Sequence, residues 1–278
     1  MMNYPRILTI QDISCVGQCS LTVALPILSA CGLETAILPS AVLSTHTGGF
    51  QGYTFRDLTE DMPAIAAHWR REEIGFSAVY TGYLGSSRQI DCVREIFDTL
   101  LVPGGLRIVD PAMADNGKLY PGFDAAYVEE MKRLAFCADV ILPNITEAAF
   151  LTGTEYRSEY DETYIDGLFA ALKRNGARRV VLTGVGYEEN STGVVVYDGT
   201  KKQYYRHIRY ARGSHGTGDV YASAFVGALM RGKTDYEAAV IAADYTVRCI
   251  ETTAALPDHW YGVAFEPVLG ELIARLDK

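Results

Sequence analysis

A glycine-rich segment near residue 216 has the residue types of an anion site. Two glycines bracket a hydroxyl residue and an acid follows at once, in the order His215-Gly216-Thr217-Gly218-Asp219. The apolar residues of Val220–Met230 recur at helical spacing. The glycines are therefore predicted at a helix N-terminus, where free N–H groups and the helix dipole attract negative charge. Without Cβ atoms, they let the backbone approach an anion closely.

Asp219 is expected in the first turn of that helix, beside the anion site. The dipole favours its ionised form, so a carboxylate base would lie next to N–H groups that can hold phosphoryl oxygens. This combination indicates phosphoryl transfer. The alternative is a glycine-rich turn followed by an ordinary first-turn acid, and these five residues alone do not decide between the two.

Polar residues follow several of the predicted strands. Ligands of open α/β sheets bind beyond the carboxyl ends of the strands, so these residues are candidates for one nucleotide site. They are Asp12, Tyr83, Asp110, Asn144, Glu147 and Thr183. Each has a structural alternative, because Asn and Asp often cap the next helix, and for Asn144 capping is about as plausible as ligand contact. Magnesium chemistry needs carboxylate oxygens near phosphates, which Asp110, Asp115 and Glu147 could supply.

Strand-like and helical segments alternate along the chain. Strands are predicted at Arg6–Ile10, Glu34–Leu38, Ala78–Thr81, Leu106–Val109, Val140–Leu142 and Arg179–Thr183, and helices at Leu21–Cys31, Met62–Glu73, Ser87–Leu101, Tyr127–Phe136 and Tyr164–Asn175. A hairpin of Val194–Tyr197 and Gln203–Ile208 follows, then the Gly216 helix and helices near Tyr236–Ile250 and Phe265–Leu276. Strands joined by crossover helices predict an α/β fold, a three-layer sandwich whose mainly parallel sheet has helices on both faces and a late antiparallel hairpin.

Composition favours one domain over residues 1–278, because 49% of the chain is hydrophobic and no linker, low-complexity tract or repeat interrupts it. The formal net charge of −9 argues against nucleic acid or an anionic membrane as a partner. No apolar run has membrane-spanning length and no signal peptide is evident, so we expect a cytoplasmic protein. The six scattered cysteines are expected to be reduced thiols in or near the core.

Residues 227–234, Gly-Ala-Leu-Met-Arg-Gly-Lys-Thr, match the P-loop pattern by letter. A true P-loop follows a strand and opens a helix, whereas this segment closes an apolar helix and has Gly232 at a C-cap position. We therefore predict that Lys233 has no catalytic part. No G-x-G-x-x-G follows the first strand, so the usual dinucleotide-binding fingerprint is missing.

Several motifs spread along the chain belong together. They are Ile7-Leu8-Thr9-Ile10-Gln11, Ser44-Thr45-His46-Thr47-Gly48, Thr81-Gly82-Tyr83-Leu84-Gly85-Ser86, Asp110-Pro111-Ala112-Met113-Ala114-Asp115, Leu142-Pro143-Asn144-Ile145-Thr146-Glu147 and Gly216-Thr217-Gly218-Asp219. In this order they resemble the first strand, the Ser-Asn-His-Thr segment, the Gly-Tyr-Leu-Gly stretch, the Asp-Pro-Val-Met-Gly-Asp motif, the Pro-Asn-x-x-Glu motif and the catalytic Gly-x-Gly-Asp of the pyridoxal kinases. That family belongs to the ribokinase-like superfamily, and the resemblance covers essentially the whole chain.

The resemblance implies ATP-dependent phosphorylation of the 5′-hydroxymethyl group of a B6 vitamer (pyridoxal, pyridoxine or pyridoxamine) in cofactor salvage. By analogy, Asp219 would deprotonate that hydroxyl while the N–H groups of Gly216, Thr217 and Gly218 hold the transferring phosphoryl group. The expected ATP site comprises Asp110, Asp115, Tyr120, Asn144, Glu147 and Thr183, with Asp110 and Glu147 arranging Mg²⁺ and Tyr120 in a loop over ATP. The expected vitamer contacts are Asp12, Thr47 and Tyr83, while His46 would orient its own loop. A monovalent-cation requirement is left open, and a homodimer is expected.

Asp12 stands where pyridoxal kinases often have serine. Its carboxylate could accept a charge-assisted hydrogen bond from a cationic group of the vitamer and so favour pyridoxamine. Alternatively, it caps the following loop or helix and never meets the ring. Leu142 in place of Thr and Ala114 in place of Gly are the other departures from the family pattern.

Two other functions compete with B6 phosphorylation. One is a hydroxymethylpyrimidine kinase of the same architecture, against which Ser44–Thr47 and Tyr83 favour the B6 vitamer. The other is a non-catalytic B6-binding protein of the same fold. The intact Asp219 and its flanking glycines argue against a pure binder, which needs neither a base nor a site for transition-state charge.

Overall fold

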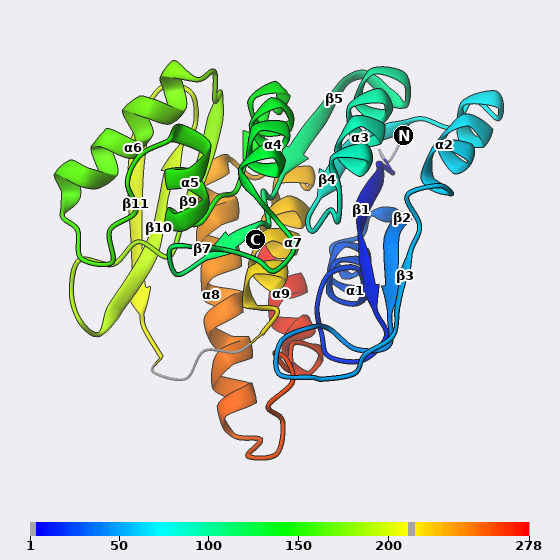
Figure 1. Cartoon of the computed structure of the whole chain (residues 1–278). Coiled ribbons are helices and arrows are strands. Elements are labelled where there is room, and N and C mark those ends of the chain that lie inside the picture. Colours follow the sequence, from blue (N-terminus) through cyan, green and yellow to red (C-terminus); the bar gives the residue numbers. More distant parts are fainter. Residues whose placement is uncertain (1–3, 211–214, 278) are drawn as a thin grey trace.

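The structure, a computed structural model, describes residues 4–210 and 215–277. A nine-stranded sheet, in the order β11-β10-β9-β8-β5-β4-β1-β2-β3, runs from one side of the molecule to the other (Figure 1). Six neighbouring strands are parallel: β1 (Arg6–Ser14), β2 (Glu34–Leu43), β4 (Phe76–Thr81), β5 (Leu101–Val109), β8 (Val140–Ile141) and β9 (Arg179–Thr183). The antiparallel strands are β3 (Phe55–Asp57) at one edge and the hairpin of β10 (Ser191–Tyr197) and β11 (Lys202–Ile208) at the other. A separate small hairpin joins β6 (Ala114–Asp115) and β7 (Lys118–Leu119).

Helices cover both faces of the sheet (Figure 1). One face packs against α2 (Met62–Arg71), α3 (Ser87–Thr99), α4 (Ala125–Cys137), α5 (Ile145–Thr152) and α6 (Glu162–Arg174). The other packs against α1 (Leu21–Ala30), α7 (Thr217–Met230), α8 (Asp235–Ala254) and α9 (Leu269–Leu276). Successive strand residues alternate between the two cores, as Ile108 and Val109 do, which explains why the parallel strands are apolar throughout. The predicted three-layer α/β fold is confirmed.

Several strands differ in length from the sequence prediction. The structure extends β1 by four residues and β2 by five, because their ends pair with each other, Ile13 with Val42 and Ser14 with Leu43. A register shift between Gln11 and Ile13 separates this pairing from the regular part, which runs through Gln11. Asp12 therefore lies inside a strand, at an irregularity, and not after the strand as predicted.

Some elements were not predicted, and one predicted helix is divided. Strand β3 is a three-residue edge strand with every residue exposed, so it lacks the apolar alternation that marks a strand. The last helical segment is also divided, because a 3₁₀ turn at Glu266–Val268 with proline in its first turn precedes α9. The short α5 and the β6–β7 hairpin were missed too.

The P-loop look-alike is a turn between two helices. Gly232 has a φ of 86° after the end of α7, and Thr234 begins α8 with a capping box to Glu237. The segment lies at the opposite end of α7 from Gly216, so the prediction that it is not a P-loop is confirmed.

All six cysteines are free, which agrees with the expected reduced thiols. Cys15 is nevertheless exposed, so the expectation that every cysteine lies in or near the core is wrong for this residue. It lies in the turn after β1, outside the apolar pattern that sequence reasoning follows. Among residues 4–210 and 215–277, no helix is long and apolar enough to cross a membrane.

Candidate active site

The predicted site residues gather at one edge of the sheet, because the parallel strands all end there. Helix α7 brings its N-terminus to the same edge. The backbone N–H of Ser20, just beyond β1, donates to the Asp219 carboxylate, and the charges of Asp12 and Asp110 lie close enough to interact with Asp219. The structure thus brings together acids from β1, from the loop after β5 and from α7.

The glycines at the start of α7 have different roles. Gly216 is the N-cap, with a left-handed φ of 79°, and a Cβ there would lie 2.0 Å from the carbonyl oxygen of Gln18. Gly218 is exposed, and a Cβ there would meet no atom within 4 Å. Gly216 is therefore required by the fold, whereas Gly218 faces open space at the first turn of α7, the end towards which the backbone N–H groups of a helix point.

Asp219 titrates near neutrality. Burial raises its pKa to about 7, the hydrogen bond from the Ser20 N–H acts in the opposite direction, and the charge of Asp12 adds to the rise. A carboxylate of this pKa is a stronger base than an ordinary aspartate and is still substantially ionised at pH 7. It can accept a proton from an alcohol at the neighbouring anion site.

Asp110 and Glu147 form a second acidic centre. Burial raises the pKa of Asp110, and the charges of Glu147 and Asp219 raise it further. Burial also raises the pKa of Glu147, against the effect of backbone N–H donors from Asn144 at 2.8 Å and Met113 at 3.1 Å. Two like charges held together in this way would be stabilised by a divalent cation.

The donor set fits a metal held largely through water. Within the described parts of the chain, no three His, Cys, Asp or Glu side chains gather as a closed metal site would require. Both oxygens of Glu147 already accept backbone hydrogen bonds. Mg²⁺ usually keeps several waters and takes one or two carboxylates together with substrate phosphates, so the pair fits this ion better than a dedicated protein cage would.

Asn144 has the structural role that the sequence left open. It caps α5 in a capping box, in which its side chain accepts from the N–H of Glu147 and the Glu147 carboxylate accepts from the N–H of Asn144. Its amide also donates to the carbonyl of Ala114 at 2.8 Å. Asn144 and Glu147 thereby fix the β6–β7 hairpin next to the acidic centre.

Tyr120 follows that hairpin, with its N–H donating to the carbonyl of Met113 at 2.8 Å. Tyr120 is 36% exposed as a whole, but desolvation raises the pKa of its hydroxyl, and the charges of Glu147, Asp115 and Asp110 add to the rise. Asp115 itself is exposed and accepts hydrogen bonds from Asn116.

Thr183 ends β9, and its hydroxyl donates to the carbonyl of Pro143 at 3.4 Å, a long hydrogen bond. The next residue, Gly184, is exposed with a φ of 75°, and its carbonyl accepts from the Tyr160 hydroxyl at 3.3 Å. Thr183 therefore lies at the same edge of the sheet as Asn144, to which β9 is bridged.

The candidate vitamer residues lie around the end of β1. Both oxygens of Asp12 accept serine hydroxyls, from Ser14 at 2.9 Å and from Ser20 at 2.5 Å, and its side chain is buried. This geometry favours the structural alternative for Asp12. Thr47 is exposed in the loop after β2. Tyr83 is half-buried after β4, with its ring 5.5 Å from that of Phe123.

His46 has the geometry of a residue that orients its loop. Its Nδ1 accepts the N–H of Gly48 at 3.0 Å, so its Nε2 carries the proton and donates to the carbonyl of Tyr261 at 2.6 Å. The ring is buried and lies 5.1 Å from that of His215, just before the anion site. The loop after β2 is thus tied to the 258–262 loop.

Sequence reasoning missed the turn between β1 and α1. Gln18 packs its carbonyl against Gly216, and Ser20 touches both Asp12 and Asp219. The signal was a glycine, Gly17, close after the first strand, followed by polar residues where a loop at the binding edge was expected.

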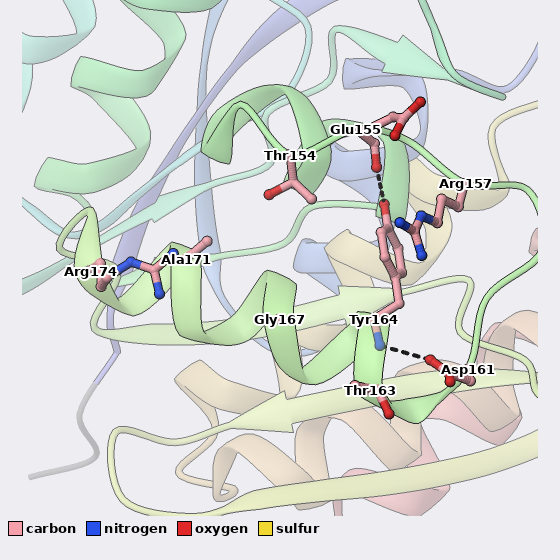
Figure 2. A pocket seen from close by; sticks show the side chains of 9 residues that line it. All are labelled: Thr154, Glu155, Arg157, Asp161, Thr163, Tyr164, Gly167, Ala171 and Arg174. Carbon is pink, nitrogen blue, oxygen red and sulfur yellow. Dashed lines mark hydrogen bonds between the residues drawn. The ribbon is translucent and has the colours of Figure 1, made fainter.

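A surface hollow of about 510 Å³ lies elsewhere, between α6 and the segment before it (Figure 2). In it the hydroxyl of Tyr164 donates to the carbonyl of Glu155, and the Arg157 guanidinium lies 5.5 Å from the ring of Tyr164. Its lining comprises Thr154, Glu155, Arg157, Asp161, Thr163, Tyr164, Gly167, Ala171 and Arg174, none of which is a predicted site residue. We assign the hollow no part in the candidate site.

Solved structures of similar sequence share this fold. A Bacteroides thetaiotaomicron protein, provisionally named a phosphomethylpyrimidine kinase and solved with pyridoxal, is 36% identical, with a TM-score of 0.91 over 97% of this chain and 96% of its own. Pyridoxal kinase from Lactobacillus plantarum is 34% identical, with a TM-score of 0.90 over 98% of both chains. Pyridoxal kinase from Leishmania donovani, solved with ADP and pyridoxamine, is 20% identical, with a TM-score of 0.86 over 96% of this chain and 95% of its own, and shows the shared fold alone.

Curated relatives point the same way. A pyridoxine/pyridoxal/pyridoxamine kinase of Bordetella bronchiseptica is 28% identical over 89% of this chain and 89% of its own length. A hydroxymethylpyrimidine/phosphomethylpyrimidine kinase of Streptomyces coelicolor is 28% identical over 91% of this chain and 90% of its own length.

Fold, site and relatives together define a phosphotransferase of the ribokinase-like superfamily. Within that class, residues 28–263 match the model of the phosphomethylpyrimidine kinase family, and the chain belongs to that family. The expected kinship with the pyridoxal kinases is confirmed by the relatives and solved structures.

Proposed function

We propose that the protein transfers the γ-phosphoryl group of ATP to the 5′-hydroxymethyl group of a B6 vitamer, in salvage of the cofactor. The observation that carries this proposal is Asp219, a carboxylate with a pKa raised to about 7 beside a helix N-terminus that faces open space at Gly218. Relatives named as kinases of pyridoxal, pyridoxine and pyridoxamine support the acceptor, and an ADP-bound pyridoxal kinase of the same fold supports the nucleotide.

In this proposal Asp219 accepts the proton of the attacking hydroxyl. The N–H groups of Gly216, Thr217 and Gly218 hold the phosphoryl oxygens as charge develops on them. Tyr83 and Thr47 contact the vitamer, while Thr183, Asp115 and Tyr120 contact ATP. Asn144 acts mainly by holding the β6–β7 hairpin in place through its bond to Ala114.

Mg²⁺ would lie near Asp110 and Glu147 and supply charge neutralisation for the phosphates. This chain's part is to hold the two carboxylates together, and the backbone N–H groups of Asn144 and Met113 fix the orientation of Glu147.

The second candidate substrate is hydroxymethylpyrimidine. The Streptomyces coelicolor relative and the family model favour it, because both are named for phosphorylation of pyrimidines. Both substrates present a hydroxymethyl group on a heteroaromatic ring, so the same base and anion site serve either. Product detection with ATP, magnesium and each vitamer or hydroxymethylpyrimidine separates them, and the absence of any product would support the non-catalytic B6-binding alternative.

The substitution Asp219→Asn tests the proposed base. It keeps the shape of the side chain and removes the proton acceptor, so turnover should fall by about 10²–10⁴-fold while calorimetric affinities for ATP and vitamer change by less than about threefold. Asp91→Asn, which changes an exposed acid on α3, is the control and should leave turnover unchanged. Near-normal turnover in Asp219→Asn would show that another group accepts the proton.

We further propose that the protein is a cytoplasmic homodimer. Family resemblance supports the dimer, and light scattering at micromolar concentration should give twice the mass of the 30.5 kDa chain. A monomer mass would contradict it.

A further inference from the structure

The turn between β1 and α1 has an uncommon backbone. Gln18 and Ser20 have φ values of 48° and 55°, in the left-handed region that residues with a Cβ rarely adopt, and Gly17 before them has 123°. Such conformations persist only where the surroundings impose them, and they often lie at functional sites. Something in the structure must therefore hold this turn.

The turn contacts the candidate site at two points. The carbonyl oxygen of Gln18 packs against Gly216 so closely that a Cβ on Gly216 would lie 2.0 Å from this oxygen. The backbone N–H of Ser20 donates to the Asp219 carboxylate. The turn thus faces both the N-cap of α7 and the proposed base.

Asp12 binds the turn through hydrogen bonds of its side chain. It lies at the register shift of β1, between Gln11 and Ile13, and a shift of this kind re-aims a side chain out of the regular strand pattern. Its buried carboxylate accepts the hydroxyl of Ser20 at 2.5 Å on one oxygen and that of Ser14 at 2.9 Å on the other. Ser20 is therefore bound through its side chain to Asp12 and through its backbone to Asp219.

We propose that Asp12 is a positioning residue for phosphoryl transfer: by binding the Ser20 hydroxyl it fixes the strained turn so that the Ser20 N–H points at Asp219. This role rests on the proposed function of Asp219. It also accounts for a carboxylate at this position, because its two oxygens reach two separate hydroxyls, those of Ser14 and Ser20, whereas a serine side chain has a single oxygen at one place.

Several other groups face Asp219 and influence its titration. They are Asp12 from β1, Cys19 from the turn, Tyr80 from β4, Asp110 from the loop after β5 and Tyr120 beyond the β6–β7 hairpin. A test of the Ser20 contact must therefore affect these groups alike in the variant and in its control. Substitutions of the two serines meet this condition, since neither side chain is charged and each removes one hydroxyl donor from Asp12.

The experiment compares Ser20→Ala with Ser14→Ala by the pH dependence of kcat at saturating ATP, magnesium and vitamer. Each variant removes one serine hydroxyl from Asp12, and only Ser20 contacts Asp219. Loosening a hydrogen bond to a carboxylate should raise the apparent pKa of the acidic limb by about one unit in Ser20→Ala. Turnover would then fall about fivefold at pH 7 and recover above about pH 9.

Ser14→Ala should keep the wild-type acidic limb. An acidic limb that is unchanged in Ser20→Ala, or shifted equally in Ser14→Ala, would overturn the proposal. Ser20→Gly is the second variant should Ser20→Ala fail to fold, because glycine tolerates a φ of 55° and also lacks the hydroxyl. Its limb should shift in the same direction, and an unshifted limb would equally overturn the proposal.

Asp12→Ser separates positioning from direct substrate contact. A positioning residue should lower kcat for pyridoxal and pyridoxamine by the same factor and leave both KM values unchanged. A selective rise in KM for pyridoxamine would show that Asp12 binds the vitamer. Failure of the proposed function can be told apart from failure of this inference. Near-normal turnover in Asp219→Asn would refute Asp219 as the base. Lost turnover in Asp219→Asn together with an unshifted acidic limb in the Ser20 variants would refute only the role of Asp12.

Discussion

At the residue scale, the balance of opposing effects on Asp219 decides its chemistry. Burial raises its pKa towards the working pH, and the N–H of Ser20 prevents a larger rise. Turnover should therefore increase with pH through about 7, as the ionised base becomes the major form. The same residue with its ordinary pKa would be fully ionised at pH 7 but a much weaker base.

The two glycines before Asp219 allow a paired prediction at the same scale. Gly218→Ala adds a Cβ in open space within a helix, so the free energy of unfolding should rise by up to about 1 kcal/mol while kcat/KM falls, because the methyl group occupies phosphoryl space. Gly216→Ala places a Cβ at a φ of 79° against the Gln18 carbonyl and should destabilise the fold by at least about 1–3 kcal/mol. Chemical denaturation and steady-state kinetics measure both. Wild-type kinetics in Gly218→Ala would leave the segment a structural turn only.

At the scale of elements, the N-terminal ends of two helices position the residues of the candidate site. The N-terminus of α7 forms the proposed anion site, and the capping box of α5 fixes Glu147, whose charge acts on Asp110. Each depends on the first N–H groups of a helix, which point out of its N-terminal end. The C-terminal end of α7 has no such role, although its sequence mimics a P-loop.

Lys233 tests that distinction. It follows the C-terminal end of the 14-residue α7, about 20 Å from Gly216 at the rise of an α-helix. Lys233→Ala should therefore leave kcat and both KM values within about twofold of wild type. A loss of a hundredfold or more in turnover would place the active site at the wrong end of the helix.

At the scale of the whole molecule, two hydrophobic cores share one sheet. Neighbouring residues of the same strands, such as Ile7 and Leu8 of β1 or Val180 and Val181 of β9, point into opposite cores. Both cores depend on the same strands, so loss of the strands from one core would also remove them from the other. We therefore predict one cooperative unit over residues 1–278. Scanning calorimetry should show a single unfolding transition. Two separable transitions would contradict the single domain.

Much of this protein was determined by its sequence alone. The alternation of strands and helices was predictable because apolar periodicity is a local property, set by which residues of a segment face the core. The glycine-rich start of α7 was predictable as a helix N-terminus from the apolar pattern that follows it, and its proposal as an anion site rests on its own backbone. Family motifs added the membership of a kinase family and supported the proposed B6 substrate.

Only the tertiary structure decided how those residues meet. The ends of β1 and β2 exist as strands because each pairs with the other, and the short edge strand β3 is formed by its pairing with β2. The partners of Asp12 and the capping role of Asn144 depend on which atoms lie opposite them. The sequence shows the same residue type whether that residue binds a ligand or holds a loop or helix in place. The raised pKa of Asp219 likewise arises from burial and from neighbours elsewhere in the chain. These properties belong to contacts between distant segments, which local sequence patterns do not encode.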